Sequence, residues 1–272
     1  MMKLVTYEKL DGSLSVGEMR GDSLYSLGID LSMQEIAEKG FPANDESFKV
    51  MKHNGIQAPV MPSKIFCVGR NYAEHAAELS NAVPTSPLIF SKYPTAVVAN
   101  EQNVQWHADI TQKVDWEGEL AVVIGKRAKN IREEDAYDHI FGYTIANDIS
   151  ARDLQDSESQ WIRAKSQDTF CPLGPVIVTA DEITDPHNLR VVTKVNGDTM
   201  QDGQTSDMIF KIPYLVAFLS RTFTLLPGDI ILTGTPSGVG KAMKPPRFLN
   251  DGDVVSVTID GIGTLTNTCE IL

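Results

Sequence analysis

The chain has 272 residues, of which 42% are hydrophobic and 22% are charged. This composition is too apolar for a disordered chain, and the length is sufficient to bury a large core, so we expect one sizeable domain with a small addition. The 36 acidic residues exceed the 24 basic ones and give a net charge of −12. Such an excess disfavours nucleic acid or an anionic membrane as a partner.

The cysteines and the first residues favour a cytoplasmic location. Cys67, Cys171 and Cys269 lie far apart and form no C-x-x-C pair, so we expect neither a disulfide framework nor a thiolate zinc site. The opening residues MMKLVTYE contain no apolar signal-peptide core, and charged or turn residues interrupt every apolar run before it reaches the length of a membrane span. We therefore expect a soluble protein without a membrane partner.

Short strand-like runs separated by turn signals begin the chain. The runs over residues 3–8, 13–20 and 23–27 are divided by Asp-Gly and Gly-Asp pairs, which predicts a small antiparallel meander followed by a short amphipathic helix. Gly and two prolines interrupt residues 51–63 and indicate a boundary near residue 60. We expect a small β-rich N-terminal domain over 1–60 and the main domain over 61–272.

Strands predominate over helices in the main domain. Hairpin signals at Asn196-Gly197 and Asp260-Gly261 favour a mostly antiparallel sandwich or roll over a repeating βαβ fold. Strands are expected over 64–68, 88–90, 96–99, 120–124, 141–147, 174–178, 189–195, 229–233, 253–259 and 263–269. Helices are expected over 72–79, 132–137 and 207–220, where Pro213 either kinks the last helix or marks its start.

The run VDWEGELAVVIG over residues 114–125 carries two glutamates at alternate positions. On a strand, Glu117 and Glu119 would project from the same face with Cα atoms roughly 6.5 to 7 Å apart. The apolar run that follows predicts an interior strand, where unpaired carboxylates are costly and a bound cation would remove that cost. The alternative is a solvated strand face, because Asp115 has the same parity.

A third carboxylate, Asp148, ends the apolar strand predicted over 141–147. Like the two glutamates, it needs a partner if it is buried. Three carboxylates without cysteine or clustered histidine make an all-oxygen site. Such a site suits Mg²⁺ or Mn²⁺, with Ca²⁺ as an alternative, better than Zn²⁺, and open positions would let a substrate chelate the ion.

A polar pair is expected on the helix that follows the first main-domain strand. His75 and Glu78 are three residues apart and share one helix face, so the carboxylate can make the imidazole a better base. The alternative is an ordinary polar pair on a surface helix. Lys165 precedes a rigid turn at Gly174-Pro175, where its charge could face a substrate carboxylate or a developing enolate. The remaining histidines lack such a companion.

A glycine-rich loop follows the strand predicted over 229–233. It is not a P-loop, because Thr235 stands where a glycine is needed and Ala242 replaces the required Ser or Thr. A tight turn at Pro236 and Gly238 is expected to hold Thr235 and backbone N–H groups toward an anionic ligand. A purely structural hairpin is the alternative.

The order of these motifs resembles the fumarylacetoacetate hydrolase family over about residues 62–272. The motifs are VGRNYAEH (68–75), DWEGEL (115–120), NDISARD (147–153), Lys165 with Gly174-Pro175, and TGTPSGVG (233–240). The resemblance implies a mixed β-roll with few helices, commonly homodimeric, that binds Mg²⁺, Mn²⁺ or Ca²⁺ beneath a mobile helical lid. The chain is shorter than fumarylacetoacetate hydrolase itself, which favours the shorter bacterial-type members.

The same resemblance assigns roles to individual residues. It implies metal ligands at Glu117, Glu119 and Asp148, a catalytic dyad at His75 and Glu78, a substrate-facing cation at Lys165, and substrate contacts at Arg70, Gln155 and Thr235. Arg152 and Asp153 would serve as scaffold.

The implied activity is hydrolysis or lysis of a C–C bond in a small 2-oxo acid, of the acylpyruvate hydrolase or oxaloacetate decarboxylase type. The metal would act as a Lewis acid for an enolate, and the dyad would activate water in the hydrolase. An alternative is an isomerase of unsaturated dioic acids such as 2-hydroxyhepta-2,4-diene-1,7-dioate. Alternatives of other classes are a binding module with structural Ca²⁺ and a nucleotide-binding protein.

Overall fold

The computed structural model describes residues 2–29, 31–40 and 47–272, so part of the predicted N-terminal domain lies outside the described residues. The strands are β1 (Lys3–Glu8), β2 (Leu14–Arg20), β3 (Ser23–Ser26), β4 (Phe48–Lys49), β5 (Gly55–Gln57), β6 (Ile65–Gly69), β7 (Leu88–Lys92), β8 (Val97–Val98), β9 (Asn103–Trp106), β10 (Val114–Asp115), β11 (Gly118–Ile124), β12 (Ile140–Asn147), β13 (Ser150–Ala151), β14 (Cys171–Thr179), β15 (Arg190–Val195), β16 (Asp198–Gln204), β17 (Ile230–Leu232), β18 (Val254–Ile259) and β19 (Gly263–Ile271). The α-helices are α1 (Met33–Lys39), α2 (Ala73–Glu78), α3 (Arg152–Ser157), α4 (Ile162–Lys165) and α5 (Ile212–Thr222). The 3₁₀ helices are η1 (Pro94–Ala96), η2 (Glu133–His139), η3 (Ala180–Glu182), η4 (Thr205–Asp207) and η5 (Gly240–Ala242).

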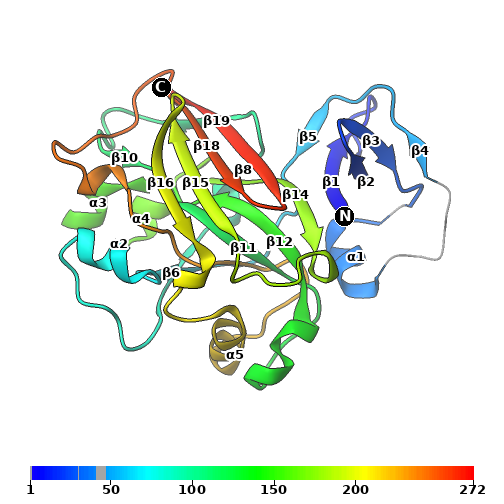
Figure 1. The fold of residues 1–272 in the computed structure, drawn as a ribbon. Helices are drawn as coiled ribbons and strands as arrows, with labels where there is room; N and C mark the ends of the chain where they lie inside the picture. Colours follow the sequence, from blue (N-terminus) through cyan, green and yellow to red (C-terminus); the bar gives the residue numbers. More distant parts are fainter. Residues whose placement is uncertain (1, 30, 41–46) are drawn as a thin grey trace.

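Two sheets form the body of the protein (Figure 1). The larger sheet has the strand order β4-β3-β2-β1-β14-β12-β11-β17-β6-β7, with β5 paired to β1 and β8 to β14. The smaller sheet has the order β16-β15-β18-β19-β9. Most neighbours are antiparallel, whereas β17 with β6, β8 with β14 and β19 with β9 are parallel. The predicted mixed β-roll with few helices is confirmed.

The central strand β11 is covered on both faces. All seven of its residues are buried, which explains why its sequence is a continuous apolar run rather than an alternating one. Leu120 and Val122 cluster with Val191 of β15 and Val257 of β18 from the smaller sheet. The two sheets approach each other closely at Gly118, where a Cβ would lie 2.2 Å from Thr193 Oγ1.

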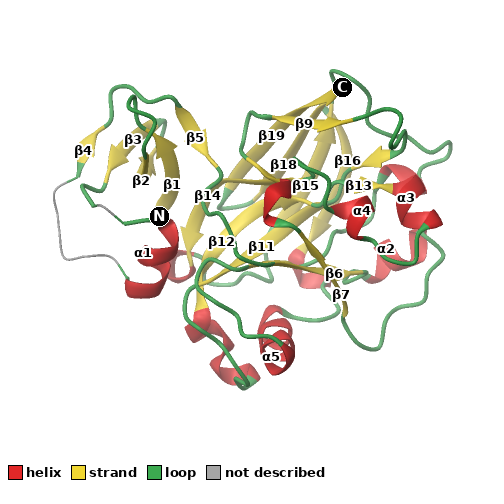
Figure 2. Cartoon of the chain, turned by 180° about the vertical axis from the view of Figure 1, so that it is seen from behind, coloured by secondary structure: helices red, strands yellow, loops and turns green. Residues whose placement is uncertain are grey.

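The N-terminal strands form the predicted meander and continue the larger sheet. β1 pairs antiparallel with β2 and, on its other side, with β14 through Lys3 and Leu4. The expected amphipathic helix is α1, which begins with a capping box between Ser32 and Glu35. Figure 2 shows this region on the opposite side of the body from α2, α3 and α4. The domain boundary near residue 60 stays a prediction.

The helices differ from expectation in detail. The segment expected to be helical over 132–137 is the 3₁₀ helix η2, and the helix expected from 207 begins at Ile212. Pro213 lies in the first turn of α5 and therefore marks its start, because the first backbone N–H groups of a helix need no intrahelical partner. The sequence analysis missed β4, β5, β9, β10, β13, β16, α3 and α4; apart from β16, each of these spans only two to six residues. Among the described residues, no helix could cross a membrane.

The close approach at Gly118 predicts a specific mutational response. Gly118→Ala should lower the free energy of unfolding by about 1–3 kcal/mol, because the methyl group overfills the space between the sheets. Thr193→Ala should be nearly neutral, since its buried hydroxyl has no hydrogen-bond partner in the described chain. Urea unfolding of the two single variants and of the double variant measures the energetic coupling between the two substitutions. Fully additive losses would show that the Thr193 contact is not the cause.

His187 predicts a pH dependence of stability. Its Nε2 accepts a hydrogen bond from the Ile212 N–H at the start of α5 (3.1 Å), and burial together with the charge of Lys211 lowers the pKa of its imidazole. The folded state therefore favours the neutral ring, and this stabilisation is present above the unfolded pKa of about 6.5 and lost as the pH falls toward the lower folded value. Urea unfolding should show a smaller loss of stability below about pH 6.5 for His187→Gln. An identical pH profile for both proteins would contradict the assignment.

Candidate metal centre and active site

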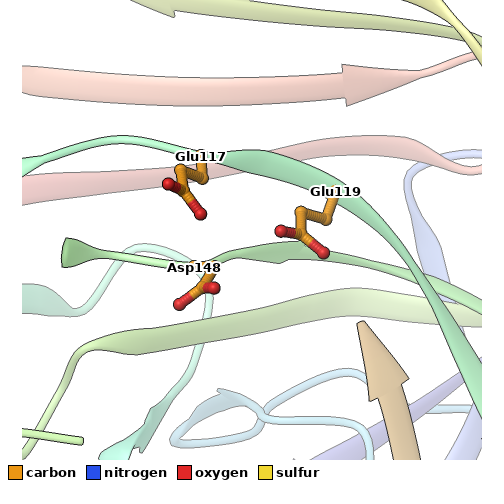
Figure 3. A group of neighbouring side chains, drawn as sticks. All are labelled: Glu117, Glu119 and Asp148. Carbon is orange, nitrogen blue, oxygen red and sulfur yellow. The ribbon is translucent and has the colours of Figure 1, made fainter. Parts of the chain in front are cut away.

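Three acidic side chains gather at one end of the β11–β12 pair (Figure 3). Glu119 lies in β11, whereas Glu117 precedes this strand and Asp148 follows β12. The Asp148 N–H donates to the Glu117 carbonyl oxygen (2.8 Å), which brings the two ends together. One carboxylate oxygen from each residue lies within 4.8 Å of the others. The three residues are 1–5% exposed, so a solvated strand face is excluded.

Asp115 does not belong to a solvated face either. It lies in the separate strand β10 and is fully buried. Its Oδ2 pairs with Arg152 Nε at 2.8 Å, and its oxygens also accept from the backbone N–H groups of Gly240 (2.7 Å) and Lys241 (3.0 Å). Asp115 therefore does not share a strand face with the two glutamates, although it is an even number of residues away, because the chain between β10 and β11 is not a continuous strand.

Buried cations surround the carboxylates. Lys165 Nζ lies 2.8 Å from Glu117 Oε2 and 2.9 Å from Asp148 Oδ2. Arg152 Nη1 lies 2.7 Å from Glu117 Oε1, so the arginine expected as scaffold directly holds a predicted metal ligand. Lys165 lines the neighbouring cavity as expected of a substrate-facing cation, but its ammonium is bound by the protein's own carboxylates.

The local charges shift the pKa values of the two glutamates in opposite directions. Burial raises the pKa of Glu117, but the charges of Lys165 and Arg152 outweigh burial and hold the pKa of this carboxyl well below its usual range. Burial and the negative charges of Asp148 and Glu117 raise the pKa of Glu119 well above its usual range. Glu119 accepts from the Gly234 N–H (2.6 Å), and no lysine or arginine of the described chain forms an ion pair with it.

These features fit a divalent cation. The donors are hard oxygens, and the described group of ligands contains neither cysteine nor histidine. This donor set is typical of Mg²⁺, Mn²⁺ or Ca²⁺. A dication would supply the positive charge that Glu119 lacks, so the residues that could hold it are Glu117, Glu119 and Asp148.

A cavity of about 410 Å³ opens beside the carboxylates. It brings together residues that are distant in sequence, and the predicted site residues among its lining are Arg70, His75, Glu117, Glu119, Gln155, Lys165 and Thr235. Asp148 and Glu78 do not line it, but Glu78 is hydrogen-bonded to His75, which does. Phe90 and Trp161 contribute an aromatic wall, with their rings edge to face at 5.3 Å.

His75 and Glu78 form the expected pair on α2. His75 Nδ1 lies 2.7 Å from Glu78 Oε1, and the other carboxylate oxygen accepts from the Gly238 N–H at 2.8 Å. His75 is 5% exposed and lines the cavity. When Nδ1 donates to Glu78, Nε2 is left as the nitrogen that can accept a proton.

The glycine-rich loop binds anions, but they are the protein's own. Its backbone N–H groups donate to Glu119, Glu78 and Asp115. For the N–H groups of Gly234, Gly238 and Gly240, the expectation of an external ligand is therefore wrong. Gly234 has φ +98°, which glycine adopts without strain. Thr235 lines the cavity as expected, with its hydroxyl donating to the Gly118 carbonyl oxygen at 2.9 Å.

Lys92 is the residue that the sequence analysis missed. It ends β7 and is fully buried, with Nζ 2.7 Å from Asp148 Oδ1. Its only sequence signal is a lysine at the end of an otherwise mostly apolar strand. That signal is weak, because strands commonly end with a solvated lysine.

Comparison with known proteins gives a consistent result. The sequence model described as "Fumarylacetoacetate (FAA) hydrolase C-terminal" matches residues 64–270. The chain is 47% identical over 272 residues to oxaloacetate tautomerase YisK of Bacillus subtilis, covering 97% of this chain and 89% of the relative. A fumarylacetoacetate hydrolase structure from Exiguobacterium antarcticum has a TM-score of 0.91, 40% identity and full coverage of both chains. A 2-hydroxyhepta-2,4-diene-1,7-dioate isomerase structure from Mycobacterium marinum has a TM-score of 0.84 and 40% identity, covering 100% of this chain and 99% of the other.

The burial of Arg152 predicts a large stability effect. Arg152→Met should lower the free energy of unfolding by about 3 kcal/mol or more, because Asp115 and Glu117 would lose a buried partner. Arg132→Met is the matched control: its side chain is 68% exposed and pairs with Glu134 and Asp135. Loss of these exposed ion pairs should change the free energy of unfolding by no more than about 0.5 kcal/mol. Equal losses in urea unfolding would contradict the role given to Arg152.

Proposed function

The chain belongs to the fumarylacetoacetate hydrolase family, and on this basis we propose that it interconverts the keto and enol forms of oxaloacetate or a closely related 2-oxo dicarboxylic acid. The observation that carries the proposal is the placement of a His–Glu pair and three converging carboxylates on one cavity. The name of the Bacillus subtilis relative, oxaloacetate tautomerase, agrees with this chemistry.

Glu117, Glu119 and Asp148 would hold Mg²⁺ or Mn²⁺ at one end of the cavity. When bound, the ion would supply Lewis acidity that polarises the 2-oxo group of the substrate. Lys165 lies beside the same carboxylates and provides a second positive charge toward the oxygen on which negative charge develops.

The dyad accounts for the proton transfer. His75 Nε2 accepts a proton from C3 of the keto form while Glu78 stabilises the resulting imidazolium through Nδ1. The His75 imidazolium then gives this proton to the 2-oxo oxygen to form the enol, and the reverse transfer regenerates the keto form. One C–H bond and one O–H bond are exchanged, and no C–C bond breaks.

Arg70 is the cation best placed for the second carboxylate of the substrate. It lines the cavity and makes no ion pair within the described chain. Lys241 also lines the cavity, but its ammonium is already paired with Asp156. Gln155 and Thr235 add polar contacts, and the pair of Phe90 and Trp161 limits the size of the substrate.

A second candidate is isomerisation of an unsaturated dioic acid, which the similarity to the Mycobacterium marinum isomerase favours. It needs the same acid–base groups, because a double bond shifts by removal of one proton and addition of another. Hydrolysis of an acylpyruvate and decarboxylation of oxaloacetate, as implied by the sequence, differ in breaking a C–C bond. The cytoplasmic location and the homodimer stay predictions.

Enol oxaloacetate provides the test. The protein should accelerate the decay of the enol ultraviolet absorbance over a blank containing the metal alone, without matching release of pyruvate. Chelation should abolish the acceleration, and Mg²⁺ or Mn²⁺ should restore it. His75→Asn should lower the rate about 10²- to 10⁴-fold, whereas His139→Asn on η2 should not change it.

Two results would contradict this assignment. Stoichiometric release of pyruvate would show that the protein decarboxylates oxaloacetate rather than tautomerising it. A His75→Asn rate within twofold of the wild type would exclude the dyad as the proton-transfer group.

A further inference from the structure

We propose that Lys92 is a positioning residue that leaves Asp148 only one oxygen for a metal ion and thereby makes the three-carboxylate centre select Mg²⁺ and Mn²⁺ over Ca²⁺. The inference rests on the metal site of the proposed function and is independent of the reaction catalysed there.

Lys92 is held by oxygens on several sides. Its Nζ donates to the backbone carbonyl oxygens of Ile149 (3.0 Å), Phe170 (2.7 Å) and Lys165. An ammonium group has three N–H donors, so these carbonyls use all of them. The contact with Asp148 Oδ1 is then an ion pair with a charge that is fixed in place.

The two oxygens of Asp148 consequently differ. Oδ1 faces Lys92, which is fully buried and absent from the cavity lining, whereas Oδ2 faces Lys165, which lines the cavity. Among the described residues, the Lys165 ammonium contacts the side chains of Glu117, Asp148 and Phe90. Lys92 is thus tied to three backbone carbonyls, whereas Lys165 is held by side chains at the cavity wall. A dication near Oδ1 would meet fixed positive charge in a poorly screened interior.

The two glutamates follow the same pattern. Glu117 Oε1 is held by Arg152 Nη1 at 2.7 Å, and Glu119 Oε2 is held by the Gly234 N–H at 2.6 Å. One oxygen of each carboxylate thus lies beside a group anchored in the fold, which is a hydrogen-bond donor for Glu117 and Glu119 and the Lys92 charge for Asp148. An ion would take Glu119 Oε1 and would share Glu117 Oε2 and Asp148 Oδ2 with the Lys165 ammonium, which donates to both.

Three single oxygens suit some hard cations better than others. Mg²⁺ takes six ligands in near-octahedral geometry and keeps several waters, which exchangeable substrate oxygens can replace. Ca²⁺ takes six to eight oxygens and commonly binds carboxylates through both of them. A carboxylate that cannot rotate to offer its second oxygen therefore penalises Ca²⁺ more than Mg²⁺.

A purely structural role for Lys92 makes a different prediction. The lysine also joins the end of α4 to the start of β14 through the carbonyls of Lys165 and Phe170. If that were its whole role, Lys92→Met would weaken the fold and reduce the affinity for every divalent ion by the same factor. The ratio of the Mg²⁺ affinity to the Ca²⁺ affinity is therefore the informative measurement, rather than the stability or the activity of the variant.

Calorimetric titration of chelator-treated protein with Mg²⁺, Mn²⁺ and Ca²⁺ tests the proposal. The wild type should bind Mg²⁺ and Mn²⁺ more tightly than Ca²⁺. Lys92→Met should lower the ratio of Mg²⁺ to Ca²⁺ affinity about 10-fold or more, because Asp148 can then offer both oxygens and Ca²⁺ gains more from the second oxygen than Mg²⁺ does. Lys241→Met is the control, because it removes a cavity-lining lysine that contacts no metal ligand, and it should leave the ratio unchanged.

Either of two results would overturn the proposal: wild-type protein that binds Ca²⁺ as tightly as Mg²⁺, or a Lys92→Met variant with an unchanged ratio. If Lys92→Met does not fold, Lys92→Arg, which keeps the charge, decides: it should preserve the wild-type ratio, and a ratio shifted toward Ca²⁺ would overturn the proposal. Enol turnover without ion selectivity would contradict this inference alone. Selectivity without turnover would contradict the proposed reaction alone.

Discussion

The burial of four carboxylates in one small region is the constraint on which the rest of the structure depends. Asp115, Glu117, Glu119 and Asp148 are at most 5% exposed, and burying a charge without a partner is prohibitive. Lys92, Arg152 and Lys165 compensate three of these charges, and within the described chain Glu119 accepts from a backbone N–H and forms no ion pair. The unequal balance fits a cation site better than an internal ion-pair network.

The architecture supplies these partners from many parts of the chain. The acidic residues come from the ends of β10, β11 and β12, and the cations come from β7, α3 and α4. The glycine-rich loop after β17 adds backbone N–H groups that reach Glu119, Glu78 and Asp115. One loop therefore connects the carboxylate cluster to the His75–Glu78 pair, and displacing it would disturb both groups together. The two sheets meet at Gly118, directly between the two glutamates, so their packing also determines the geometry of the centre.

Much of this arrangement is predictable from local patterns. The apolar runs and turn signals identify β1, β6, β11, β12 and β18, because burial and hairpin formation leave regular traces in sequence. Glu117, Glu119 and Asp148 are recognisable because carboxylates beside buried apolar strands need compensation. The 3₁₀ form of η2 and the short α3 and α4 are not recognisable, since one or two turns contain too few residues to establish a period.

The sequence by itself determined the β-rich fold, the acidic cluster and the His75–Glu78 pair, all of which depend on residues close together along the chain or on the order of motifs. Only the tertiary structure decided that Asp115 belongs with Arg152, that Lys165 is bound by carboxylates, and that Lys92 lies beneath Asp148. Lys92 and Asp148 are separated by 56 positions, and no local pattern distinguishes a buried lysine from a solvated one at a strand end. The difference arises because an ammonium group is stable in the interior only where several oxygens from separate segments converge on it, and that convergence exists only in the folded chain.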